Sequence, residues 1–535
     1  MKKLLGIFLV PVLMLLTVTG CKKSFEDLTQ NTNVPNSVPA SLLFNGILNA
    51  MVEYPDNSKE IYDQYYIYNY DYYGNNRYDF GSGDNYYTAL KNVVAMENTA
   101  ASTGGGKINP YEALGKFFKA YFFTKMSLEE GDIPMTQALQ GLSNLTPAYD
   151  TQKQVFQQAF SWLESANADL SVLINDPNNT DIGPGEGHLL KNDIFFANNL
   201  NKWQKTVNTF RIRLLLQLSK KTSETDLNVV PQFASIIGNS TKYPVMQSTD
   251  DNLQFIFVAP SNYYPETPDN FGQSGSRQNT SATYIGLLTQ LQDPRVFVTA
   301  EPARYNVDTL KQSPTAFTSF IGADPGLDLG VMYNNAGLQK YSFLNRKRYY
   351  STYTGEPSIQ IGYPELMFNI AEGINRGWAT GDAESYYVKG IQSSFQFYGI
   401  PTGTGTFTAY FYRPGSTSTA NSSNYDTYPI NVDWPSYYAQ LNVKYTSDAA
   451  GLTKILQQKY LALFRHSGLE SYFTYRRTHV PEFTTGPGTG NGSRIALRFK
   501  YPGSERTSNA DNYNKALASQ YGGNDDINGI MYILK

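Results

Sequence analysis

Apolar residues recur at helical spacing along much of this sequence. In residues 154–170 (QVFQQAFSWLESANADL) they follow one another at intervals of three and four, which places them on one face of a helix. Thr151 occupies a plausible N-cap position before this helix, and Gly377 and Gly399 occupy positions that can end two others. We therefore predict a mostly α-helical fold. The same spacing appears in residues 111–126, 203–221, 363–377, 383–399 and 455–466.

Long irregular segments, rich in Gly, Ser, Thr, Asn and Pro, separate these helices. Loops beyond about 15 residues are uncommon in compact domains and are often functional. The chain has 42 tyrosines, and many of them fall in these loops. A tyrosine ring can stack on a sugar or a peptide while its hydroxyl forms a hydrogen bond, although most single rings fill the core. Aromatic loops on a helical scaffold favour a binding function. The segments are 66–86, 176–193, 259–283, 401–436 and 484–511.

The N-terminus has the pattern of a bacterial export signal. Two lysines precede the apolar run LLGIFLVPVLMLL, which is too short for a comfortable membrane span. Val18-Thr19-Gly20-Cys21 then resembles the lipobox of bacterial lipoproteins, whose cysteine is acylated and becomes the first residue of the mature chain. We predict a lipoprotein signal peptide over residues 1–20 and lipidation at Cys21. The alternative is an ordinary signal peptide with an incidental cysteine.

The residues after Cys21 are polar and rich in Pro and Asn, as in a flexible tether. We predict that residues 21–39 form this tether and that residues 40–535 form one helical domain. Acyl chains on Cys21 would hold the protein at a bilayer.

Composition argues against several other classes of protein. The net charge is −3, and loss of Lys2 and Lys3 with the signal would bring it to about −5. A mildly acidic chain without a basic stripe is a poor candidate for nucleic-acid binding. The single cysteine excludes an internal disulfide framework and a multi-cysteine zinc site.

Motifs for catalysis, metals and cofactors are weak or absent. His188, His466 and His479 lack the spacing of a helical zinc site, and no G-x-S-x-G elbow occurs. The C-terminal NDDINGIMYILK begins like a calcium loop but has Lys535 where glutamate is required. We expect no metal, no cofactor and no enzymatic activity. A carboxylate pair for glycoside hydrolysis stays open, because distance in the fold defines such a pair.

Several stretches together resemble SusD-like (SusD/RagB-like) outer-membrane nutrient-binding lipoproteins of the Bacteroidetes, in particular the type-two branch. They occur in the family's order and reach almost to the C-terminus. Near the end, where the branch often has a Trp-Trp pair, this chain has Met531 and Tyr532. The matching segments are GDIPMTQAL (131–139), residues 195–221, DPRV (293–296), YPELMFNIAEGINRGW (363–378), residues 386–400, 455–483 and 494–517.

The resemblance implies a SusD-like fold with tetratricopeptide-like helix pairs and a lipid anchor in the outer membrane, facing the cell exterior. It also implies a SusC-like TonB-dependent transporter as partner, with this protein as its hinged lid. We assign the most recognisable residues to structure. Arg211 and Arg213 are expected to bridge helices through carboxylates, and Arg476 and Arg477 to donate structural ion pairs.

Candidate ligand contacts come from the chemistry of the loops, since the family's binding loops vary too much to align. Rings that stack on a sugar face, next to Asn or Arg donors, would give modest affinity at each contact. The alternative for the whole group is a transporter-facing or self-packing surface. The candidates are Tyr72, Tyr73, Asn75, Arg77, Tyr78, Tyr263, Tyr264, Tyr350 and Trp434.

The leading hypothesis is a surface receptor that binds oligosaccharide nutrients and delivers them to its transporter. A peptide or another nutrient is the alternative ligand, because a groove lined by Tyr and Asn suits both. A surface glycoside hydrolase is the alternative from a different class.

Overall fold

The computed structural model describes residues 38–55, 58–104, 106–176 and 189–535. The chain divides into two units, Met1–Pro39 and Ala40–Lys535. Only the second is described below. The signal peptide, Cys21 and His188 lie outside the described residues, so the boundaries given above for the signal and the tether stay predictions.

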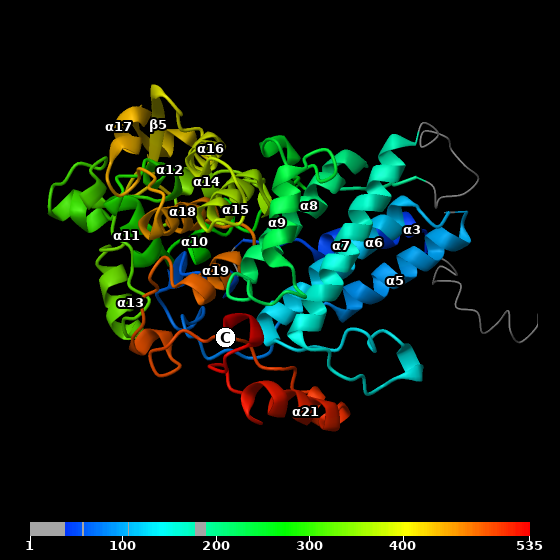
Figure 1. The fold of residues 1–535 in the computed structure, drawn as a ribbon. Helices are drawn as coiled ribbons and strands as arrows, with labels where there is room; N and C mark the ends of the chain where they lie inside the picture. Colours follow the sequence, from blue (N-terminus) through cyan, green and yellow to red (C-terminus); the bar gives the residue numbers. More distant parts are fainter. Residues whose placement is uncertain (1–37, 56–57, 105, 177–188) are drawn as a thin grey trace, which may run out of the picture. The chain divides into compact units, whose positions relative to one another are not determined.

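Helices dominate the described chain, as the apolar spacing predicts (Figure 1). Each long helix buries one apolar face, and α6, α8 and α15 are buried on nearly all sides. The longer helices are α3 (Ala40–Ala50), α5 (Tyr87–Ser102), α6 (Pro110–Glu130), α7 (Gln152–Asn175), α8 (Leu200–Gln217), α9 (Val229–Gly238), α11 (Ala282–Gln290), α13 (Leu329–Gly337), α15 (Tyr363–Asn375), α16 (Ala383–Phe397), α18 (Ala449–Ala462), α19 (Glu470–Thr478) and α21 (Ala510–Tyr521). The shorter ones are α4 (Ser58–Tyr62), α10 (Phe271–Ser274), α12 (Val296–Thr299), α14 (Arg346–Tyr349), α17 (Trp434–Ala439) and α20 (Glu505–Ser508).

Helices that follow one another in the chain pack against each other. Helix α5 contacts α3 and α6, α7 contacts α6 and α8, and α15 contacts α16, as Figure 1 shows for the blue-to-green region. A second set of contacts joins α18 to α15 and α16. Packing of each helix against the next long helix in the chain is the arrangement expected for tetratricopeptide-like helix pairs, although long segments separate α6 from α7 and α7 from α8.

Local signals define the helix ends. Thr151 and Gln154 form a capping box at the start of α7, which confirms the N-cap prediction. Gly377 and Gly399 have φ of 76° and 72°, respectively, and follow α15 and α16. Glycine adopts this left-handed conformation without the steric cost of a Cβ atom, so both helices end where the glycines predict.

The described chain has three two-stranded antiparallel sheets, and two of them join distant segments. Strand β1 pairs with β3 so that Ile67 lies opposite Asn279, and β2 pairs with β4. The third sheet is the hairpin of β5 and β6. The β1–β3 pair is the one that positions the candidate site, because it brings the loop after β1 beside the segment before β3. The strands are β1 (Tyr66–Tyr68), β2 (Leu253–Phe255), β3 (Gln278–Thr280), β4 (Ser358–Ile361), β5 (Thr404–Tyr412) and β6 (Tyr425–Asp433).

Arginines on the helices connect the elements of the core. Arg213 of α8 pairs with Glu365 of α15, and Arg477 of α19 pairs with Glu372 of α15. A planar guanidinium matches a carboxylate with two hydrogen bonds, so such pairs fix one helix against another.

The remaining two helix arginines differ in their partners. Arg211 pairs with Glu164 of α7, as expected. Arg476 was expected to donate an ion pair, and this prediction is wrong. Its guanidinium donates to the carbonyls of Leu497 and Leu128, both at 2.7 Å. These carbonyls belong to irregular backbone at a helix end and a loop, where a fork of N–H donors replaces the missing backbone partners.

No helix in the described part of the chain is long and apolar enough to cross a membrane.

Candidate functional site

Four tyrosine rings gather at the surface just after β1. Tyr70, Tyr72 and Tyr73 lie on one loop, and Tyr333 comes from α13. The ring centroids of Tyr70 and Tyr333 are 5.0 Å apart, and those of Tyr72 and Tyr73 are 5.2 Å apart. Tyr72 is 81% exposed, Tyr73 41% and Tyr333 44%. We call these four residues the tyrosine cluster. The ring planes differ by 31° for Tyr70 and Tyr333 and by 77° for Tyr72 and Tyr73, so the rings form an uneven apolar platform with hydroxyls at its rim.

Two asparagines hold the loop that carries the cluster. Asn76 accepts from the backbone N–H of Tyr68 and donates to its carbonyl, both at 2.8 Å. Asn69 donates from its side chain to Oδ1 of Asn279 on β3, at 2.6 Å. A Cβ atom at Gly74 would lie 2.5 Å from the Tyr68 ring, so only glycine fits there. These contacts fold the loop back on β1 and direct its rings outward.

Arg277 joins the tyrosine cluster from the segment before β3. Its guanidinium carbon lies 5.0 Å from the ring centroid of Tyr70 and 5.6 Å from that of Tyr73. Both distances are in the range of cation–π contacts. The Asn69 N–H donates to the Arg277 carbonyl at 3.0 Å, which extends the β1–β3 pairing to this residue.

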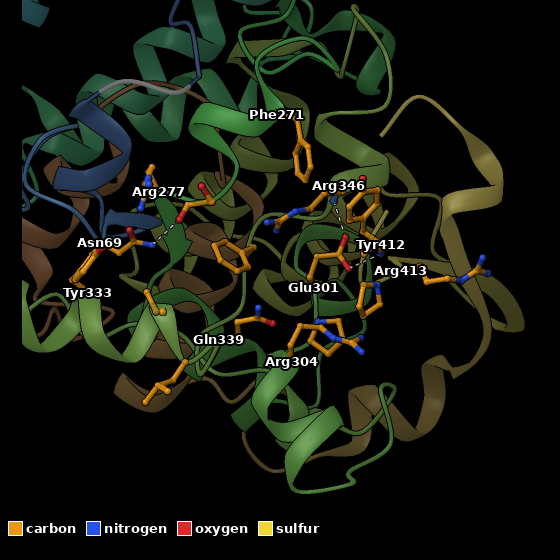
Figure 2. A pocket seen from close by; sticks show the side chains of 18 of the residues that line it. Asn69, Phe271, Arg277, Glu301, Arg304, Tyr333, Gln339, Arg346, Tyr412 and Arg413 are labelled. Atoms are coloured by element: carbon orange, nitrogen blue, oxygen red, sulfur yellow. Dashed lines mark hydrogen bonds between the residues drawn. The ribbon is translucent and has the colours of Figure 1, made fainter. Parts of the chain in front are cut away.

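A cavity of about 550 Å³ opens beside the cluster (Figure 2). This volume is within the range of small-molecule sites. Five separate parts of the chain line it, and they supply polar, aromatic and small side chains. Its lining includes Phe271, Arg277, Glu301, Arg304, Tyr333, Gln339, Phe343, Arg346, Tyr412 and Arg413.

Glu301 is the one carboxylate among the described residues that line this cavity. Its two oxygens accept from the backbone N–H groups of Arg346, at 2.8 Å, and Tyr412, at 3.0 Å. Burial raises the pKa of Glu301, and the positive charge of Arg346 partly offsets this effect. Both oxygens of Glu301 are thus held by backbone N–H groups.

The residues expected at the site fall into two groups. Tyr72 and Tyr73 belong to the tyrosine cluster. Asn75 and Arg77 are exposed on the same loop, where Asn75 accepts from the Arg77 N–H at 3.0 Å and Arg77 pairs with Asp79. These four remain ligand-contact candidates.

The other candidates lie elsewhere. Tyr78 and Tyr264 are buried in the core, and the Tyr78 hydroxyl donates to the Tyr62 carbonyl at 2.8 Å. Tyr350 is also buried, with its ring against Phe271. We therefore assign these three to packing.

Tyr263 and Trp434 are accessible but belong to separate aromatic pairs. The Tyr263 ring contacts Tyr353 at 4.8 Å, and Trp434 stacks on Tyr438 at 5.7 Å. Neither residue lines the cavity, so the structure does not bring them together with Tyr72 and Tyr73.

Reasoning from the sequence alone missed Tyr70, Tyr333, Arg277 and the arginines of the cavity. Tyr70 lies in the same tyrosine-rich stretch as Tyr72 and could have been included on composition. Tyr333 and Arg277 carry no such signal, because their role depends on the pairing of β1 with β3.

Comparisons with known proteins agree with this fold. The model of the SusD-like family described as "Starch-binding associating with outer membrane" matches residues 31–502. The chain therefore belongs to the SusD-like family, whose members are nutrient-binding and glycan-binding proteins of the outer membrane. It is in particular a member of the type-two branch. This confirms the family and the mostly helical fold expected from the sequence.

Solved structures extend this result. Two SusD homologues from Bacteroides fragilis each share 28% identity with the chain, with TM-scores of 0.77 and 0.74. Both comparisons cover 93% of this chain and 100% of the homologue. A chitin-binding SusD homologue from Flavobacterium johnsoniae has 21% identity and a TM-score of 0.67, over 93% of this chain and 98% of that one, and so shares the fold. No curated protein matches the sequence.

Proposed function

We propose that this protein is a non-enzymatic surface receptor that binds oligosaccharides at the tyrosine cluster and the adjoining cavity. In this proposal it is anchored in the outer membrane through Cys21, faces the cell exterior and serves as the lid of a SusC-like TonB-dependent transporter. Membership of the SusD-like family supports the nutrient-binding role. The lipobox resemblance supports the anchor.

The observation that carries the proposal is the exposed tyrosine cluster beside a large cavity, which Tyr333 of the cluster also lines. The apolar face of a pyranose ring can lie on a tyrosine ring, while the hydroxyls around its edge bond to side chains. Arg277 supplies donors close to the rings, and Asn75 and Arg77 add polar side chains on the same loop. Several stacking positions along one platform suit a chain of sugars better than a single small molecule.

An extended peptide is the second ligand class, because aromatic platforms also accept peptide side chains. The test is a panel of neutral and charged oligosaccharides and mixed peptides, presented to the protein made with Cys21→Ser so that it carries no lipid. We expect saturable binding to oligosaccharides and no release of reducing ends. Binding to peptides alone would show that the ligand is a peptide and not an oligosaccharide. Release of reducing ends would show that the protein is a hydrolase and not a receptor.

Alanine substitutions test whether the ligand binds at the tyrosine cluster. Removal of a stacking ring should weaken binding about tenfold, which corresponds to about 1.4 kcal/mol. We expect this for Tyr73→Ala and Tyr333→Ala. Tyr263→Ala is the matched control, since Tyr263 is equally exposed but lies outside the cluster. Equal losses from all three variants would mean that binding does not depend on the tyrosine cluster.

A further inference from the structure

Arginines dominate the charged lining of the cavity beside the tyrosine cluster. Arg277, Arg304, Arg346 and Arg413 surround it, and Glu301 is the one acid among the described residues of its lining (Figure 2). In a chain whose net charge is −3, this gathering of positive charge is local. Charges of one sign in a concave site with low-dielectric walls reinforce one another and attract ligands of the opposite sign.

Two of these arginines already have carboxylate partners. Arg304 donates from Nε to Asp308 at 3.0 Å, and Arg413 donates from Nε to Asp426 at 2.9 Å. The carboxylates balance much of the charge of these two arginines, and both ion pairs are partly exposed to solvent.

Arg277 and Arg346 differ from them, because neither has a carboxylate partner in the part of the chain that the structure describes. The Arg277 guanidinium contacts the rings of Tyr70 and Tyr73. Arg346 is 7% exposed and donates to the carbonyls of Leu344, at 2.9 Å, and Gly275, at 2.6 Å. Its guanidinium carbon lies 4.2 Å from the ring centroid of Phe343. A buried guanidinium with neutral partners retains a charge that an incoming anion can balance.

Glu301 supplies only part of that balance. It bonds the backbone of Arg346 and Tyr412, not the guanidinium groups of the cavity. Burial lowers the pKa of Arg346, and Glu301 counteracts only part of this effect. Because Glu301 is the one acid in the described lining and both Arg277 and Arg346 lack a carboxylate partner there, the cavity keeps positive charge in excess of its own acids.

We propose that this cavity binds the carboxylate groups of acidic oligosaccharides, those built from uronic acids, and that Arg277 and Arg346 recognise the charge. This inference rests on the proposed function and specifies its ligand class. A uronic acid carries a flat pyranose face and a carboxylate on the same ring. The tyrosine cluster and Arg277 offer a stacking surface and a fork of donors side by side, which matches both parts of that sugar.

The test compares ligands that differ only in charge. Oligogalacturonate and oligoglucuronate, each beside its neutral methyl ester, are titrated calorimetrically into the Cys21→Ser protein, together with a panel of neutral oligosaccharides. We expect an acidic oligosaccharide to bind at least tenfold more tightly than its ester. Binding should weaken as the salt concentration rises, because salt screens charged contacts that are open to solvent.

Substitutions of Arg277 distinguish the contribution of its charge to ligand affinity from the contribution of its packing. Arg277→Gln should weaken binding of the acid at least tenfold and leave the ester unchanged. Arg277→Lys keeps the charge but loses the planar fork, and should restore part of the affinity. Arg506→Gln, which removes an exposed arginine outside the cavity, is the control and should have no effect. Circular dichroism checks that each variant is folded.

Each alternative outcome has a defined meaning. Equal affinity for acid and ester, or tight binding of neutral oligosaccharides alone, would overturn the acidic ligand class and leave the proposed receptor in place. Binding of no oligosaccharide of any kind would overturn both.

Discussion

At the scale of single residues, His466 shows how burial couples one side chain to the stability of the fold. Its imidazole is 6% exposed, and its Nδ1 accepts from the Ile359 N–H at 3.4 Å. Burial lowers the pKa of His466 to about 4, against the opposing effect of Glu356 and with help from Arg348 and Arg465. The folded protein therefore holds this histidine neutral well below the usual pKa of about 6.5.

A pH dependence of stability follows. Between pH 6.5 and 4 the unfolded chain protonates this histidine and the folded chain does not, so stability falls as pH falls. Between pH 7 and pH 4.5 the expected loss from this group is about 2 kcal/mol. Urea unfolding of the wild type and of His466→Asn, each at pH 7 and pH 4.5, isolates the contribution of His466 to the free energy of unfolding. All other titratable groups are the same in the two proteins. The same pH slope in both proteins would contradict the prediction.

At the scale of elements, close approach of helices depends on small residues at defined positions. Gly373 of α15 lies against the Phe233 ring of α9, and a Cβ atom at this position would overlap that ring. Phe233 also packs edge-on against Trp378, at 5.6 Å, so it has little room to move. The close approach of Phe233 to α15 thus requires a glycine in the last turn of that helix.

We expect Gly373→Ala to destabilise the protein by about 1–3 kcal/mol, because overpacking forces the helices apart. Gly46→Ala is the matched control. Gly46 is an exposed residue of α3 with open space around its Cβ position, so alanine there should stabilise by about 0.5–1 kcal/mol. Thermal unfolding of both variants gives the comparison. A stabilised Gly373→Ala protein would show that the contact is loose.

Much of the helical framework was predictable, because burying one face of a helix imposes a period that can be read along the chain. The spacing in residues 154–170 and the glycines at 377 and 399 correspond to α7 and to the ends of α15 and α16. The site was predictable only in part. Tyr72 and Tyr78 occupy the same tyrosine-rich loop, yet one is exposed and the other buried. Composition does not distinguish them.

The rest of the site depends on contacts between distant parts of the chain. Asn69 and Asn279, which bond across the β1–β3 pair, are 210 positions apart. That pairing places Arg277 over Tyr70, and α13 then brings Tyr333 to the same platform. A local sequence pattern does not encode which short strands pair, since three-residue strands carry almost no periodicity of their own.

At the scale of the whole molecule, the proposed function assigns anchoring and binding to separate parts of the chain. Lipidation would involve Cys21 alone, and ligand contacts would involve residues of the unit Ala40–Lys535. Two or more acyl chains at one residue hold a protein at a bilayer through their buried methylenes, independently of any ligand site. A substitution can therefore abolish membrane anchoring without affecting ligand binding, and the reverse.

We expect Cys21→Ser to abolish incorporation of labelled palmitate and to release the protein from the membrane fraction, while its affinity for oligosaccharide in solution stays unchanged. Tyr73→Ala should do the reverse, keeping the label and the membrane location but losing about tenfold in affinity. Both variants should slow ligand uptake by cells, because a transporter lid needs position and ligand together. Retention of Cys21→Ser in the membrane fraction with full labelling would disprove the anchor, and unimpaired uptake by the released protein would disprove the lid.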